Sequence, residues 1–282
     1  MLFSYSHKAM DTAFNVMIRA AKNDENIAAA AASAAFAKID ELEGLLSKFH
    51  DSSDVAVISA LRPGDTAVVA PETMEILSIS AKVAAATQGA FDPSLGNGFG
   101  RLTLDPEHLL VAVSFPAGSA IQPLCLDFGG IGKGYALDEC RKILSGPQFA
   151  LTDYLLDAGT STIWAQGDSW PLGVGGQWKK RTRKPNTLNL SGCALSGSGK
   201  ELKGEHIVDP RKGTPAGQWE QTWAKASSGA VADALSTAAL SMTRKEIKSA
   251  CDSLEAGVMV AIRQKEWIDR FRDPLLEFGD FF

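Results

Sequence analysis

The stretch LDFGGIGKGYA, residues 126–136, carries an apolar start, an acid, a run of glycines and a lysine. The pattern predicts a strand, followed by a glycine-rich turn that leads into a helix over residues 129–144. Glycines allow a phosphate to approach the backbone, the first N–H groups of the helix donate to it, and Lys133 adds a positive charge. The stretch therefore indicates a phosphate-containing ligand, although a tight strand-to-helix turn without any ligand gives the same pattern.

The residues around Lys133 exclude two common phosphate-binding motifs. A Walker loop has Ser or Thr directly after its lysine, whereas Gly134 stands here. The GxGxxG of a dinucleotide-binding crossover is also absent from this stretch. Elsewhere the chain has neither the Gly-x-Ser-x-Gly elbow of serine hydrolases nor the His-Glu-x-x-His motif of zinc proteases.

A second candidate site is ADALST, residues 232–237, within a predicted helix. Asp233 and Thr237 are four residues apart, so both side chains lie on one helix face and can reach the same cation. Carboxylate and hydroxyl oxygens are hard ligands that suit Mg²⁺. Backbone carbonyls, waters and ligand phosphates would complete the coordination, because the protein offers few ligands here. The alternative is that Asp233 only caps or decorates the helix.

Two further stretches place polar residues beside turns. HIVDPRKGTPA, residues 206–216, has His206 before a turn, where the imidazole can orient a phosphate or move a proton. GAFDPSLG, residues 89–96, combines an Asp92-Pro93 turn with Phe91, whose ring offers an apolar face to a flat ligand. Each stretch also has a purely structural explanation, because a histidine before a turn and an Asp-Pro turn are common without any ligand.

Composition narrows the possible functions. Lys plus Arg number 28 and Asp plus Glu 33, so the net charge is −5 at pH 7. An acidic chain without a basic stripe argues against a general nucleic-acid binder. No run reaches the ~18 apolar residues that predict a membrane span. The four cysteines lack zinc-site spacing, and the absence of a leader in this sequence predicts a cytoplasmic protein.

Periodicity predicts a mixture of strands and helices without a strict βαβ rhythm, which favours an α+β fold in a single mixed domain of two lobes over residues 1–282. After a short arm, a strand is expected at 12–18 and a long helix from residue 23 or 24 to about 48. Further expectations are strands at 55–58, 67–70 and 154–165, a helix over 71–87, a glycine-rich loop at 196–204, and helices over 231–242 and 245–254.

Each motif is weak alone, but their order is specific. GAFDPSLG, LDFGGIGKGYA, ALSGSG, HIVDPRKGTPA and ADALSTAAL follow one another in a way that resembles the ApbE family of FAD:protein FMN transferases, also called flavin-trafficking proteins. The opening KAMDTAF, residues 8–14, and IDELEGLLSKFHDSSDVAVIS, residues 39–59, also resemble this family. The resemblance covers roughly residues 8 to 262.

The resemblance implies a two-lobed, T-fold-related ApbE fold that binds FAD in the cleft between its lobes. The residues that match flavin-contacting positions of the family are Met10, Phe49, Ala90, Phe91, Asp92, Asp127, Gly129, Lys133, Tyr135, His206 and Ile207. In the family, Mg²⁺ is held by a backbone carbonyl of the glycine loop, here Gly132, and by residues that match Asp233 and Thr237, with Ser236 as an assisting residue.

The reaction that the resemblance implies is transfer of FMN from FAD to a Thr or Ser hydroxyl of an acceptor protein, with release of AMP. Asp233 and His206 are the residues expected to act in catalysis, His206 as the nearest candidate for the base. Two alternatives stay open: an FAD pyrophosphatase that produces free FMN and AMP, and an FAD-binding protein without turnover. Because many family members are exported, the periplasm is the alternative to the cytoplasm.

Overall fold

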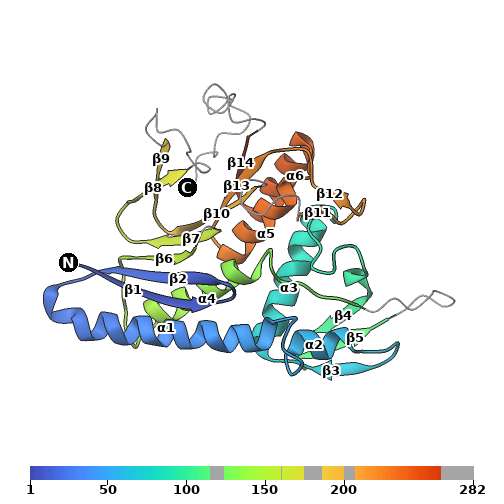
Figure 1. Ribbon diagram of the computed structural model, residues 1–282, viewed down its shortest axis with the longest axis horizontal. Coiled ribbons are helices and arrows are strands. Elements are labelled where there is room, and N and C mark those ends of the chain that lie inside the picture. Colours follow the sequence, from blue (N-terminus) through green and yellow to red (C-terminus); the bar gives the residue numbers. More distant parts are fainter. Residues whose placement is uncertain (115–123, 160, 175–185, 200–206, 262–282) are drawn as a thin grey trace.

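The computed structural model describes residues 1–114, 124–159, 161–174, 186–199 and 207–261. Its centre is a seven-stranded sheet whose neighbouring strands are all antiparallel (Figure 1). From one edge to the other, the strands are β1 (Leu2–Ala9), β2 (Thr12–Arg19), β6 (Tyr154–Ala158), β7 (Thr162–Gln166), β10 (Cys193–Gly199), β13 (Gln221–Ala226) and β14 (Gly257–Ala261).

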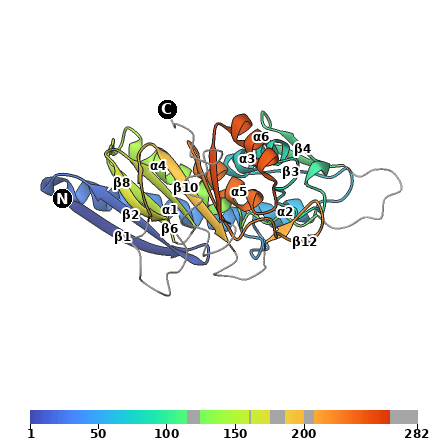
Figure 2. The same cartoon turned by 90° about the horizontal axis from the view of Figure 1, so that it is seen from above.

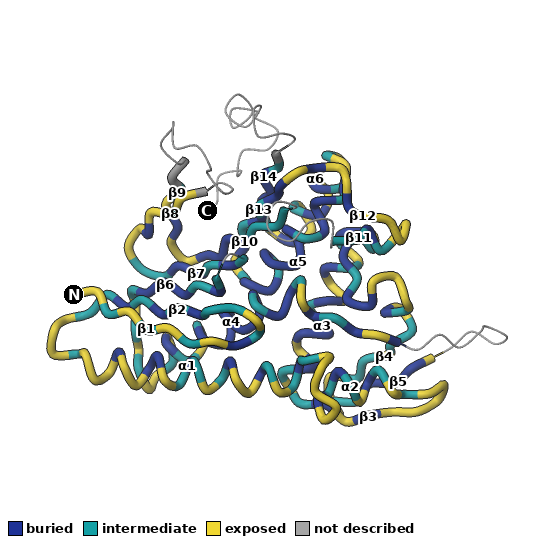
Figure 3. Tube along the Cα trace, viewed as in Figure 1, coloured by how far each residue is buried: buried dark blue, intermediate teal, exposed yellow. Residues whose placement is uncertain are grey.

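Three helices pack against one face of this sheet: α1 (Glu25–Leu46), α4 (Gly132–Ser145) and α5 (Gly229–Ala239) (Figures 1 and 2). Helix α1 lies against β1 and α4, and α5 lies against β10 and β13. The buried side of α1 begins with the alanines Ala28, Ala31, Ala32 and Ala35, whose small side chains allow a close approach, and continues with Ile39 and Leu42. Figure 3 colours these buried residues dark blue along the chain trace.

The opposite face of the sheet carries a separate apolar cluster. It is formed by β8 (Trp170–Val174) and β9 (Asn186–Leu190), which pair as an antiparallel hairpin. Trp170 and Leu190 of this hairpin are buried against Leu155, Ala165 and Leu195 of the central sheet.

A second group of elements lies beside the sheet. Helix α3 (Pro71–Ala86) and α2 (Asp54–Ser59) accompany a small sheet with the order β3 (Thr66–Val68), β5 (Leu110–Val113) and β4 (Leu102–Asp105). Helix α6 (Arg244–Leu254) packs on α3, and the short pair β11 (Val208–Asp209) and β12 (Thr214–Pro215) follows β10 in the chain. Two single turns, η1 (Lys22–Asp24) and η2 (Phe99–Arg101), complete the elements. The mixed α+β class predicted from sequence is confirmed.

Several local predictions are wrong. Residues 2–9 are an edge strand rather than an arm, and residues 55–58 belong to helix α2, because the Ser53 hydroxyl accepts the N–H of Ala56 as an N-cap. The stretch predicted as one strand at 154–165 turns back on itself between β6 and β7. The start of the predicted loop 196–204 is strand β10, where Gly197 fits directly beneath Trp223 of β13. Residues 200–206 lie outside the described part.

Two further expectations concern whole-chain properties. In the part of the chain that the structure describes, no helix is both long and apolar enough to cross a bilayer. All four cysteines are free thiols, and Cys140 and Cys193 are buried. The assignment of residues 1–282 to a single domain stays a prediction.

Candidate active site

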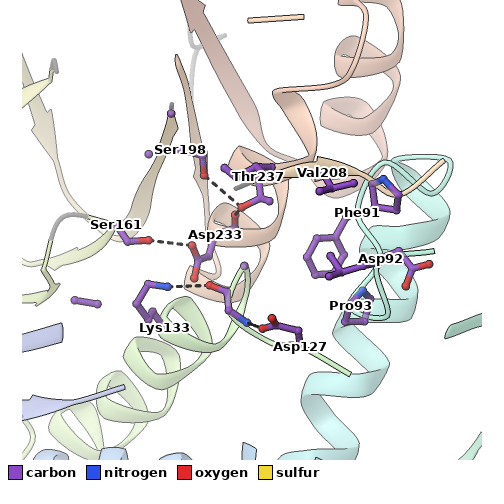
Figure 4. A pocket seen from close by; sticks show the side chains of 18 of the residues that line it. Phe91, Asp92, Pro93, Asp127, Lys133, Ser161, Ser198, Val208, Asp233 and Thr237 are labelled. Carbon is purple, nitrogen blue, oxygen red and sulfur yellow. Dashed lines mark hydrogen bonds between the residues drawn. The ribbon is translucent and has the colours of Figure 1, made fainter. Parts of the chain in front are cut away.

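A cavity of about 410 Å³ lies between the central sheet with α5 and the loop that follows α3 (Figure 4). Its walls come from segments that are far apart in the sequence: Met10–Thr12, Ala90–Pro93, Leu95, Asp127, Gly129, Gly130, Lys133, Ala158, Ser161, Gly197–Gly199, Ile207, Val208, Pro210, Asp233 and Thr237. The predicted glycine loop, the Phe91-Asp92 turn and the Asp233 helix therefore meet at one place.

The glycine loop is ordered by its own polar groups. The carboxylate of Asp127 accepts the N–H of Gly129 at 2.8 Å, and Lys133 Nζ donates to the Gly129 carbonyl at 2.9 Å. The N–H of Asp127 donates to the carbonyl of Pro93 at 2.7 Å, which joins this loop to the opposite wall. Helix α4 begins directly after the loop, so its positive end lies beside the cavity.

Asp233 is the most deeply buried acid of the cavity, with 2% of the residue exposed. Its Oδ1 accepts the hydroxyls of Ser161 and Ser196, both at 3.2 Å, and its Oδ2 accepts the N–H of Gly134 at 3.0 Å. Thr237 lies one turn later, with its Oγ1 at 3.3 Å from Ser198 Oγ. As the spacing predicts, Asp233 and Thr237 point to the same cavity (Figure 4).

The wall opposite α5 is apolar. It consists of Ala90, Phe91, Pro93 and Leu95 together with Ile207, Val208 and Pro210. The Thr87 hydroxyl at the end of α3 accepts the N–H of Phe91 at 3.1 Å, which fixes the start of this loop. Asp92 accepts both the N–H and the hydroxyl of Ser94 at 2.7 Å, so its carboxylate already closes the turn.

The pair β11 and β12 is held against α6 by an arginine. Arg211 donates to the buried carboxylate of Asp209 through Nε at 2.9 Å and Nη2 at 3.0 Å, and to Glu246 at 2.8 Å. Burial opposes ionisation of Asp209, but Arg211 outweighs it and holds the pKa of this carboxyl below its ordinary value. Because Pro210 lies between these two residues, the ion pair also fixes part of the apolar wall.

A second cavity, of about 210 Å³, adjoins the first on the other side of the glycine loop. Both cavities are lined by Met10, Asp11, Asp127, Gly129 and Lys133, while the second alone includes Glu43, Leu46, Ser47, Lys48, Phe49, Phe128 and Gly132. Phe49 is 83% exposed at this cavity. The glycine loop therefore lies between two adjoining spaces.

Lys48 and Asp127 form an ion pair at the second cavity, with 2.6 Å between Nζ and Oδ2. Burial opposes ionisation of Asp127, but the ion pair and the N–H of Gly129 outweigh it, so the pKa of Asp127 lies below its ordinary value. The pair joins the end of α1 to the glycine loop across 79 positions of sequence.

The turn between β1 and β2 lines both cavities. Ala9 pairs with Thr12, so Met10 and Asp11 form a two-residue turn, and both have positive φ, 48° and 56°. Such turns favour Asn and Gly, because other side chains are strained there. The N–H of Met10 donates to Glu43 at 2.8 Å, which holds the turn against α1.

Some predicted site residues lie elsewhere. Tyr135 lines neither cavity: it is fully buried, its hydroxyl donates to Glu75 at 2.9 Å, and burial with the nearby Glu139 and Glu75 raises its pKa. Ser236 is buried behind the cavity wall, where its hydroxyl contacts Ser198 Oγ at 2.8 Å. Gly132 lines the second cavity but not the first. His206 lies outside the described residues.

The structure also adds residues that the motifs do not single out. Ser161 and Ser198 line the larger cavity, and Lys48 lines the smaller one. Ser196 and Ser198 alternate along a strand, so a prediction of β10 would have placed both hydroxyls on the face towards α5. Lys48 lies in the turn directly after α1, and its sequence context carries no signal for a site.

Comparison with known proteins identifies the family of this chain. A model of the ApbE family matches residues 10–262. The chain belongs to the ApbE family. No curated protein sequence matches it.

Solved structures of ApbE proteins share the fold. The flavinyl transferase ApbE of Pseudomonas stutzeri, in its apo form, has 19% identity and a TM-score of 0.79, with 94% of this chain and 92% of that chain covered. The ApbE protein of Thermotoga maritima has 23% identity and a TM-score of 0.74, with 92% and 94% covered. The flavin transferase ApbE of Vibrio cholerae has 16% identity and a TM-score of 0.75, with 92% and 93% covered.

Proposed function

We propose that this ApbE-family chain transfers FMN from FAD to a Thr or Ser hydroxyl of an acceptor protein and releases AMP. The observation that carries the proposal is the glycine loop between two adjoining cavities, with Gly129 and Lys133 in the wall of both. A dinucleotide has two ring systems joined by a diphosphate. One ring system fits each cavity when the diphosphate lies on the shared loop.

The side chains of each wall suit the corresponding part of FAD. The apolar wall around Phe91, Pro93 and Leu95 offers a surface for a flat ring. The loop glycines, the start of α4 and the ammonium of Lys133 suit a diphosphate. The ammonium of Lys133 donates to the Gly129 carbonyl in this structure. Because Lys133 also lines the cavity, phosphate oxygens bound there would lie within its reach.

The charges of the larger cavity favour a divalent cation together with the diphosphate. Its described lining includes the carboxylates of Asp11, Asp92, Asp127 and Asp233 but only one ammonium, that of Lys133. A diphosphate alone would therefore meet an excess of negative charge. Asp233 and Thr237 offer hard oxygen donors on one helix face, which fits Mg²⁺.

Asp233 and Thr237 are the proposed side-chain ligands, with Ser236 as a support behind them. The Gly132 carbonyl is the backbone ligand that the resemblance implies, although Gly132 itself lines only the adjoining second cavity. Among the described residues, no group of three or more His, Cys, Asp or Glu is arranged around one point, so phosphate oxygens of FAD would complete the coordination. When bound, Mg²⁺ neutralises charge on the departing AMP and polarises the attacked phosphorus.

In the proposed step, the acceptor hydroxyl forms a bond to the phosphorus of the FMN half, and the bond from that phosphorus to the oxygen bridging to AMP breaks. The electron pair of the broken bond leaves with AMP, and the hydroxyl proton passes to a base. His206 is the proposed base. The glycine loop and Lys133 hold the diphosphate in place for this attack.

The test incubates the purified protein with FAD, Mg²⁺ and an acceptor protein that carries an Asp-x-x-Ser/Thr-Gly-Ala-Thr segment, the acceptor motif that the resemblance to the family implies. Mass spectrometry measures the FMN adduct on the acceptor, and chromatography measures AMP. We expect an adduct and an equal amount of AMP from the wild type, and loss of at least about 100-fold in rate from Asp233→Asn. Asp252→Asn, which changes an exposed carboxylate on α6, is the matched control and should keep full activity.

Other outcomes separate the alternatives. Free FMN and AMP without an acceptor would identify a pyrophosphatase. Tight FAD binding without AMP under any divalent cation would identify a binding protein without turnover. Full activity of Asp233→Asn would refute the proposed metal ligand, and full activity of His206→Gln would refute the proposed base.

A further inference from the structure

The first turns of α4 and α5 are joined by two carboxylates, each of which belongs to one helix and accepts donors from the other. Asp138 of α4 accepts the N–H of Gly229 at 2.7 Å, the N–H of Ala230 at 3.0 Å and the hydroxyl of Ser228 at 2.7 Å. In return, Asp233 of α5 accepts the N–H of Gly134. The first N–H groups of a helix have no partner within it, so each helix caps the start of the other.

The two backbones are also in direct contact at this point. A Cβ added to Gly134 would lie 2.1 Å from the carbonyl oxygen of Gly229, and one added to Gly229 would lie 2.4 Å from that of Gly134. This contact sets the distance between the helices. It does not by itself prevent α5 from sliding or tilting, whereas the directed hydrogen bonds to Asp138 do.

Asp138 does not line either cavity, and 6% of the residue is exposed. It holds the first residue of α5, from which Asp233 lies about 6 Å and Thr237 about 12 Å along the helix axis. A tilt of about 10° at the start of α5 would therefore move Thr237 by about 2 Å. Metal–ligand distances in protein sites stay within about 0.2 Å of their ordinary values, so a shift of about 2 Å would remove Thr237 from the coordination sphere.

We propose that Asp138 is a positioning residue for the metal site: by holding the start of α5 against α4, it keeps Asp233 and Thr237 in place opposite the glycine loop. This inference rests on the proposed function. The position of Gly130 supports it, because a Cβ there would be 3.4 Å from Thr237 Oγ1. The loop after Asp127 and the metal-facing side of α5 therefore fit together closely.

The test measures metal binding directly, without turnover. Calorimetry titrates Mn²⁺ into the full-length protein saturated with FAD, for the wild type, Asp138→Asn and Ser228→Ala, with Asp233→Ala as the reference that lacks the metal ligand. We expect Asp138→Asn to weaken Mn²⁺ binding by about 10-fold to 100-fold, the range for residues that orient metal ligands. The affinity for FAD in excess EDTA should change by less than about threefold.

Thr243→Ala is the matched control. Thr243 caps α6 through the N–H of Glu246, so its loss removes a helix cap away from both cavities. It should lower the thermal midpoint about as much as Ser228→Ala and leave Mn²⁺ binding unchanged.

The outcomes distinguish this inference from the proposed function. Wild-type Mn²⁺ binding by both Asp138→Asn and Ser228→Ala would overturn the inference and leave the function intact, and Ser228→Ala decides alone if Asp138→Asn does not fold. Equal weakening by Thr243→Ala would also overturn it, because the loss would then reflect general stability. If the FAD-bound wild type binds no Mn²⁺, the proposed metal dependence and this inference both fail.

Discussion

Replacement of Gly134 by alanine should destabilise the protein, although alanine is the better helix former. The added methyl group would lie 2.1 Å from the Gly229 carbonyl oxygen and 2.8 Å from Asp233 Cβ. Carbon atoms normally stay about 3.5 Å or more apart. The two helices would have to separate by roughly 1 Å or more at the point where their backbones meet.

The magnitude follows from three contributions. Overpacking costs about 1–3 kcal/mol, and weakening the hydrogen bond from Gly134 to the buried Asp233 carboxylate costs about 1.5–3 kcal/mol. The higher helix propensity of alanine returns about 1 kcal/mol. We expect a net loss of about 1.5–5 kcal/mol in the free energy of unfolding.

Urea unfolding followed by circular dichroism measures this loss, with Gly44→Ala as the matched control. Gly44 is also in a helix, but it is exposed and a Cβ there would have nothing within 4 Å. Gly44→Ala should therefore stabilise the protein by about 0.5–1 kcal/mol. Equal or greater stability of Gly134→Ala than of the wild type would refute the close contact of α4 with α5.

Three further predictions concern charge and the apolar wall. The pKa of Asp127 in the folded protein lies below its ordinary value of 3.8. The ion pair with Lys48 therefore stabilises the fold fully at pH values above 3.8, and this stabilisation is lost as the pH falls through the folded-state pKa. Lys48→Met should thus lower the free energy of unfolding by about 0.2–1 kcal/mol at neutral pH and leave it unchanged in strong acid, as measured by urea unfolding at each pH. An equal loss at the two pH values would contradict the pairing. Arg211→Ala leaves the buried Asp209 carboxylate without its main partner and should cost about 3–5 kcal/mol, whereas the exposed Lys212→Ala should cost under about 0.5 kcal/mol in the same assay. Phe91→Leu should raise the FAD dissociation constant about tenfold in a fluorescence titration, and unchanged affinity would exclude this ring from the binding surface.

The sequence motifs identify the family more reliably than they predict the helices and strands in which they lie. The order of five short stretches is sufficient to identify the family, because glycine loops and acid-hydroxyl pairs need particular residue types at fixed spacing. The helical periodicity of α1, α3 and α6 is also readable. The sequence does not reveal β1, because this edge strand has polar, half-exposed residues, and Val55–Ile58 is ambiguous because four apolar residues do not distinguish a strand from a short capped helix.

Some residues of the site can also be placed from the sequence, and others cannot. Sequence spacing places Asp233 and Thr237 on one face, because helix geometry alone determines it. It cannot place Tyr135, whose side chain turns away from the glycine loop towards Glu75 on α3, since that contact depends on tertiary packing. The hydroxyl of Ser161 and the ammonium of Lys48 escape prediction for the same reason, whereas the position of the Ser198 hydroxyl follows once β10 is recognised as a strand.

The strand order of the central sheet has a consequence for the time at which the site forms during synthesis. Strand β2 pairs with β6, and β10 pairs with both β7 and β13, so most neighbouring strands of the sheet are distant in the chain. Such non-local pairing folds slowly. The cavity needs both Met10 and Thr237, so the proposed FAD site is complete only after the chain as far as α5 has left the ribosome. FAD binding is therefore coupled to folding of the whole sheet, and the ligand should stabilise the folded state in proportion to the logarithm of its concentration.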